Sequence, residues 1–103
     1  MFVADTLQQW GREELIDDAA IAVTELATNA VLHAESDFSV AMSLLDGGVR
    51  IAVSDGSRTL PVFHEPSVNA ASGRGVAVVA ALAYRWGIEL GPTAGKTVWL
   101  VLR

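Results

Sequence analysis

The sequence contains no cysteine among its 103 residues. This absence excludes a disulfide framework, a thiolate zinc site and a cysteine nucleophile. Basic residues are also scarce, with seven Lys and Arg against twelve Asp and Glu and a formal net charge of −5. Because a nucleic-acid-binding domain usually carries a basic face, we expect no nucleic-acid partner. A nucleotide site is still compatible with this charge, since backbone N–H groups and one metal ion can hold phosphates.

The chain also lacks an apolar run long enough to cross a bilayer. Residues 1–5 have no basic segment of the kind that opens a signal peptide. We therefore expect a soluble, cytoplasmic protein with no membrane partner. Apolar residues make up 51% and charged residues 18%, which suits a folded core rather than disorder. The length fits a single domain over 1–103.

The spacing of apolar residues predicts the order helix, helix, strand, strand, loop, helix, strand, strand. We expect helices over 2–10, 14–33 and 76–84, and strands over 38–44, 49–53, 86–90 and 96–102. An Asp-Gly-Gly hairpin signal lies at 46–48, and a long loop spans about 57–75. This order has no regular βαβ alternation. It predicts an α+β fold, a two-layer sandwich with helices on one face of a mixed, largely antiparallel sheet.

A polar row on the second helix is the most informative feature of the sequence. Glu25, Asn29 and His33 are spaced four residues apart and fall on one face of an otherwise apolar helix. Glu25 could take a proton from an attacking water or hydroxyl, and Asn29 could supply a neutral oxygen to a magnesium ion. His33 fits equally well a cation near the helix C-terminus that interacts with the helix dipole.

Three further segments carry groups that suit a nucleotide. Asp55 ends a strand and could accept a hydrogen bond from the exocyclic amine of adenine. Gly73 and Gly75 precede a helix, where a phosphate would meet free backbone N–H groups. Taken singly these signals are weak, because an Asp-Gly pair also suits a turn. Lys96 also fits a solvated lysine on an edge strand.

Together the four segments resemble the ATPase superfamily of gyrase, histidine kinases, an ATP-dependent chaperone and mismatch-repair proteins. The sequence looks most like the anti-sigma-factor serine kinases within it. The segment ELATNAVLHA at 25–34 is similar to that family's N box, and VSDGS at 53–57 lies where its first glycine box does. GRGVAVV at 73–79 is similar to the second glycine box, and GKTVW at 95–99 resembles the closing strand motif. The motifs occur in the family's order over nearly the whole chain.

The resemblance implies a Bergerat-type ATP-binding fold with a lid at about 57–75. It implies Glu25 as general base and Asn29 as magnesium ligand. The residues that it places at ATP are Asn29, His33, Asp55, Gly56, Gly73, Arg74, Gly75, Val76, Lys96 and Thr97. In these roles Asp55 reads adenine, Gly73 and Gly75 hold the phosphates, and Thr97 lies near the base.

The function that the resemblance implies is a regulatory protein serine/threonine kinase that transfers phosphate from Mg-ATP to an anti-sigma antagonist and so acts on transcription. A module that sequesters a sigma factor without catalysis, with or without ATP, is the alternative, and a domain that has lost nucleotide binding is a third. Relatives often form homodimers. Leu32 stands where many relatives have Arg or Lys, so one phosphate contact is expected to be absent. The strand that precedes the first helix in relatives is expected to be missing here.

Overall fold

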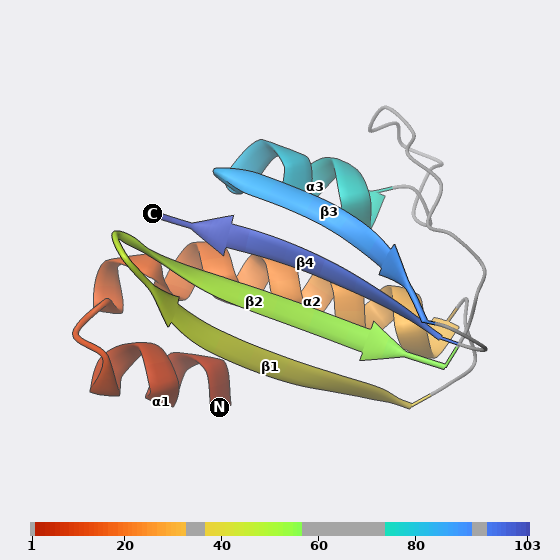
Figure 1. The fold of residues 1–103 in the computed structure, drawn as a ribbon, viewed down its shortest axis with the longest axis horizontal. Coiled ribbons are helices and arrows are strands. Elements are labelled where there is room, and N and C mark those ends of the chain that lie inside the picture. Colours follow the sequence, from red (N-terminus) through yellow and green to blue (C-terminus); the bar gives the residue numbers. More distant parts are fainter. Residues whose placement is uncertain (1, 33–36, 57–73, 92–94) are drawn as a thin grey trace.

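A computed structural model of the chain describes residues 2–32, 37–56, 74–91 and 95–103 (Figure 1). The elements in chain order are α1 (Phe2–Gln9), the 3-10 helix η1 (Glu13–Leu15), α2 (Ile16–Leu32), β1 (Phe38–Leu45), β2 (Gly48–Asp55), α3 (Arg74–Leu82), β3 (Arg85–Leu90) and β4 (Lys96–Leu102). This is the order that the apolar spacing predicts. None of the helices in the described part of the chain combines the length and the apolar character that a membrane span requires.

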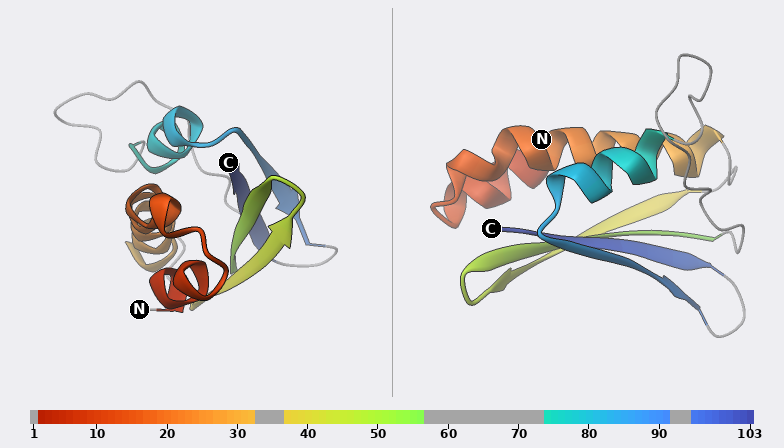
Figure 2. Two further views of the ribbon diagram at one scale, coloured as in Figure 1. Left: turned by 90° about the vertical axis from the view of Figure 1, so that its left-hand side faces the viewer. Right: turned by 90° about the horizontal axis from the view of Figure 1, so that it is seen from above.

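The four strands form one sheet in the order β1-β2-β4-β3. All the helices cover one face of this sheet, with α2 and α3 side by side above it (Figures 1 and 2). The predicted α+β sandwich is therefore confirmed. Each pairing between described strands is antiparallel, so this part of the sheet is antiparallel throughout rather than mixed.

The hairpin between β1 and β2 lies where the sequence predicts it. Leu45 pairs with Gly48, which leaves Asp46 and Gly47 as a two-residue loop. Gly47 has a φ of 79°, a backbone conformation that glycine adopts without steric cost. The Asp-Gly pair thus supplies the turn chemistry that short hairpins need.

The helix ends differ slightly from those predicted. A 3-10 turn over Glu13–Leu15 precedes α2, which begins at Ile16 rather than near residue 14. Helix α3 begins at Arg74, two residues before the predicted start, and ends at Leu82 rather than at Tyr84. It ends there because the N–H of Tyr84 donates to the carbonyl of Val101 in β4, at 2.8 Å, and so leaves the helix.

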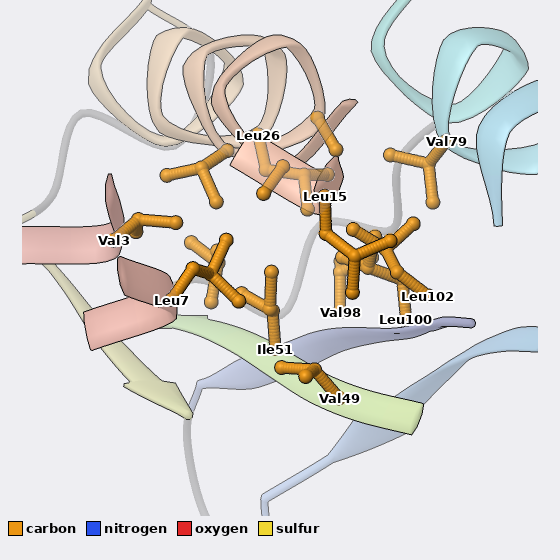
Figure 3. Packing of buried hydrophobic residues seen from close by; sticks show 14 residues of the cluster. Val3, Leu7, Leu15, Leu26, Val49, Ile51, Val79, Val98, Leu100 and Leu102 are labelled. Atoms are coloured by element: carbon orange, nitrogen blue, oxygen red, sulfur yellow. The ribbon is translucent and has the colours of Figure 1, made fainter. Parts of the chain in front are cut away.

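The core lies between the helices and the sheet (Figure 3). Helix α2 contributes a buried stripe at helical spacing, namely Ala19, Ala22, Val23, Leu26 and Ala30. Three fully buried side chains belong to the same cluster: Leu7 from α1, Ile51 from β2 and Leu100 from β4. Burial of one such side chain stabilises the fold by about 1.5–3 kcal/mol. Trp10 and Trp86 pack at the edge of this cluster.

The face of the sheet away from the helices carries Trp99. This residue pairs with Ala52 on one side and with Gly87 on the other. The guanidinium of Arg50 lies 5.5 Å from the centre of the indole ring. Val98 and Leu100 point into the core, so the strand predicted over 96–102 is confirmed and its side chains alternate between the two faces of the sheet.

Candidate functional site

Asp55 and Lys96 form an ion pair on the helix-facing side of the sheet, where β2 ends and β4 begins. The two residues are direct partners in the pairing of β2 with β4. The Lys96 Nζ lies 3.0 Å from Oδ1 and 2.9 Å from Oδ2 of Asp55. The side chain of Asp55 is 7% exposed and that of Lys96 is 9% exposed. The alternative interpretation of Lys96 as a solvated edge-strand lysine is therefore wrong, because β4 is an inner strand and the ammonium is buried against a carboxylate.

Gly95 directly precedes β4 and lies against the backbone of Asp55 at the end of β2. It has a φ of 86° and is buried directly before β4. Its carbonyl accepts a hydrogen bond from the N–H of Gly91 at 2.9 Å, which closes the connection from β3. The glycine at this position therefore places Lys96 at the start of its strand.

Thr97 lies on the other face of the sheet from Asp55 and Lys96. Successive side chains of a strand point to opposite faces, and Val98, two residues after Lys96, is in the core beneath the helices. The Thr97 hydroxyl is 2.8 Å from the hydroxyl of Ser54, its partner in β2. The structure thus brings Asp55 and Lys96 together and separates the Thr97 hydroxyl from them.

Helix α2 presents Glu25 and Asn29 beside its buried stripe. Both residues are half-buried and lie four positions apart, so they share one side of the helix. Within the described residues, no hydrogen bond or ion pair of either side chain occurs, whereas the hydroxyl of Thr28 donates to the carbonyl of Thr24 at 2.7 Å. A carboxylate and an amide that are partly withdrawn from water and have no partner in this part of the chain are available to a ligand.

The remaining predicted site residues are placed by the backbone. Arg74, Gly75 and Val76 form the first turn of α3, and Gly56 directly follows β2. The start of α3, the end of β2 and the C-terminal end of α2 lie toward the same end of the molecule (Figures 1 and 2). His33, Gly73 and most of the predicted lid at 57–75 lie outside the described residues.

No group of three or more His, Cys, Asp or Glu side chains that could hold a metal is found in the described ranges. This does not conflict with a magnesium ion that arrives with a nucleotide, because Mg²⁺ keeps several waters and takes one or two protein oxygens together with phosphate oxygens. The half-buried Asn29 amide has the neutral oxygen that such an ion accepts. Asn29 would thus be the residue that holds a magnesium ion if one accompanies the nucleotide.

Three features of the site were not found from the sequence. Ser54 and Gly95 lie within the motifs at 53–57 and 95–99 but were given no role of their own, although Ser54 bonds Thr97 and Gly95 precedes Lys96 with a positive φ. The ion pair itself was also missed, because it depends on the register of two strands that are 41 residues apart at Asp55 and Lys96. An Asp at the end of one predicted strand and a Lys at the start of another would have been a signal, had the two strands been known to pair.

These observations define a class: a domain with helices on one face of an antiparallel sheet and, at one end, a set of polar groups suited to a nucleotide. The family model of the histidine kinase-like ATPase domain matches residues 1–102. The chain belongs to this family, and membership implies that it binds ATP. Searches of curated proteins and of solved structures found no match.

Proposed function

We propose that the protein is a Mg-ATP-dependent serine/threonine kinase of the anti-sigma type, which phosphorylates an antagonist protein. The observation that carries this proposal is Glu25. It is a half-buried carboxylate that lies one turn before Asn29 and has no protein partner in the described part of the chain. A domain that only binds ATP needs no base at this position, whereas phosphoryl transfer to a hydroxyl does.

The other residues have separate roles in ATP binding. Asp55 accepts a hydrogen bond from the exocyclic amine of adenine. The first turn of α3, from Arg74, offers backbone N–H groups that have no partner within the helix and favour phosphate oxygens. Asn29 would hold the magnesium ion. When bound, that ion neutralises charge on the phosphate oxygens.

In the proposed transfer step, Glu25 acts as the general base. Its carboxylate takes the proton of a serine or threonine hydroxyl on the partner protein. The hydroxyl oxygen forms a bond to the γ-phosphorus, the bond from that phosphorus to the bridging oxygen breaks, and ADP leaves with the electron pair. The main contribution of the protein is to position the reactants, since phosphoryl transfer needs little covalent help.

The test uses γ-labelled ATP and Glu25→Gln, which removes the base and keeps the shape of the side chain. Purified protein is added to an ATP-depleted lysate of its source cells, and label on protein serine and threonine is counted. We expect labelling of a partner by the wild type and a loss of about 100-fold or more in Glu25→Gln, with ATP still bound. Glu13→Gln is the matched control, because Glu13 is exposed in η1, before α2 begins.

Two results would contradict the proposal. Equal labelling by Glu25→Gln and the wild type would show that Glu25 is not the base. Binding of ATP without any labelling by the wild type would replace the kinase with a module that sequesters its partner.

A further inference from the structure

The Asp55–Lys96 pair is the centre of a row of four residues that crosses the sheet. The register aligns Phe38 with Asp55, Asp55 with Lys96, and Lys96 with Leu90. Directly paired residues of antiparallel strands point to the same face, and this row is on the face that carries the helices. The two outer residues are exposed, Phe38 by 40% and Leu90 by 49%. A buried charged pair thus lies between two apolar side chains that are open to a ligand.

The fold alone gives little reason for charges at this point. The neighbouring row on the same face is entirely apolar and consists of Val40, Val53, Val98 and Ile88. Withdrawing two charges from water costs roughly as much as their attraction returns, and an apolar pair is often as stable. The pair is therefore better explained by a ligand than by stability.

The two side chains offer opposite hydrogen-bonding groups side by side. The ammonium of Lys96 has three N–H donors and no acceptor, and the carboxylate of Asp55 has about four acceptor sites and no donor. The contacts of Nζ with the two carboxylate oxygens use at most two of the three donors. A donor of Lys96 therefore remains, and each carboxylate oxygen can accept more than one hydrogen bond, so a ligand can bind both residues without breaking the pair.

We propose that Lys96 is a second base-reading residue, whose ammonium donates to N1 of adenine while Asp55 accepts from the N6 amine. The inference rests on the proposed function and adds a determinant of base specificity to it. On the edge of adenine the N6 donor lies next to the N1 acceptor, which complements the carboxylate and the ammonium. Guanine in the same orientation places O6 against Asp55 and N1–H against Lys96, so acceptor meets acceptor and donor meets donor. Phe38 and Leu90 flank the base with apolar surface.

The test compares nucleotides on the whole chain by titration calorimetry in magnesium buffer. The probes are ATP, GTP and 1-deaza-ATP, which has a C–H in place of N1, with 7-deaza-ATP as the matched control. We expect wild-type protein to bind 1-deaza-ATP about 10- to 100-fold more weakly than ATP, and to bind 7-deaza-ATP as it binds ATP. In Lys96→Met we expect that preference for ATP over 1-deaza-ATP to disappear. If this variant does not fold, Lys96→Thr replaces it, since one hydroxyl proton cannot serve both Asp55 and N1.

Each remaining outcome is decisive. Equal binding of ATP and 1-deaza-ATP by the wild type would overturn the role of Lys96 and leave ATP binding intact. An equal preference for ATP over 1-deaza-ATP in the wild type and in Lys96→Met would show that another group binds N1. This result would also overturn the role of Lys96. GTP bound more tightly than ATP would overturn the base assignment of both residues. No binding of ATP by the wild type would overturn the proposed function, and this inference with it.

Discussion

Gly95 and Asp55 are in backbone contact: a Cβ added to Gly95 would lie 2.7 Å from the carbonyl oxygen of Asp55. The glycine also has a positive φ of 86°. Two independent constraints, one conformational and one steric, therefore act at the point where Lys96 enters its strand beside Asp55.

We predict that Gly95→Ala weakens both the fold and ATP binding. The left-handed backbone costs an alanine roughly 1–2 kcal/mol, and the contact with a backbone atom adds to it because that atom cannot turn away. Urea unfolding should show a loss of about 2–4 kcal/mol. Gly11→Ala is the control, since Gly11 has a φ of 70° but no atom within 4 Å of an added Cβ. Equal losses in the two variants would show that the contact with Asp55 has no cost.

A second prediction concerns the buried ion pair. Asp55→Asn or Lys96→Met alone should lower the free energy of unfolding by about 3 kcal/mol, because each leaves a buried charge without its partner. The double variant should lose less than the sum of the two, since no unpaired charge remains. Urea unfolding of the four proteins gives the coupling energy. The control is the exposed pair of Arg12 and Glu14, whose N–O distance is 2.6 Å; Glu14→Gln should change stability little. If the double variant loses as much unfolding free energy as the two single variants together, Asp55 and Lys96 are not energetically coupled.

A third prediction concerns the outer face of the sheet. A Cβ on Gly87 would lie 2.7 Å from the indole of Trp99, so Gly87→Ala must displace the ring. We expect a loss of about 1–3 kcal/mol from this overpacking. In a Trp99→Leu background the same alanine should cost much less, because the ring is gone. Urea unfolding of the two single variants and the double variant measures this difference. If Gly87→Ala lowers the free energy of unfolding equally with Trp or Leu at position 99, the loss does not come from contact with the indole ring.

A fourth prediction tests Asn29 through ligand-linked stability. Mg-ATP at about 100 times its dissociation constant should stabilise the wild type by about 2.7 kcal/mol, a rise in Tm on the order of 10 °C. In Asn29→Ala most of this rise should be lost, whereas Thr28→Ala should keep it, because Thr28 is exposed on the same turn of α2. Differential scanning fluorimetry with and without Mg-ATP provides the comparison. A full rise in Asn29→Ala would remove Asn29 from the site.

The sequence predicted the elements well because each signal was local. Apolar residues at helical spacing marked α2, alternation marked β4, and Asp46 with Gly47 marked the hairpin. The ends of the helices were less accurate, because α3 ends where Tyr84 bonds to Val101, and that partner is 17 residues away.

The arrangement of the predicted site residues could be derived only partly from the sequence. The four-residue spacing of Glu25 and Asn29 was enough to predict that the two side chains share one side of a helix. The pairing of Asp55 with Lys96 and the position of Thr97 on the opposite face depend on strand register, which local patterns do not encode. Contacts across the sheet were therefore the part that only the three-dimensional fold could supply.

The strand order has a consequence for biosynthesis. β4 is the last strand of the described sheet along the chain, yet it lies between β2 and β3, and within that sheet β3 pairs with β4 alone. Until the ribosome has made β4, β2 has one neighbour and β3 has none. The apolar faces of the helices and of the earlier strands therefore cannot be fully buried until β4 emerges from the exit tunnel. Completion of the sheet is thus a late event for this domain, and the edge of β2 that pairs with β4 stays unpaired until then.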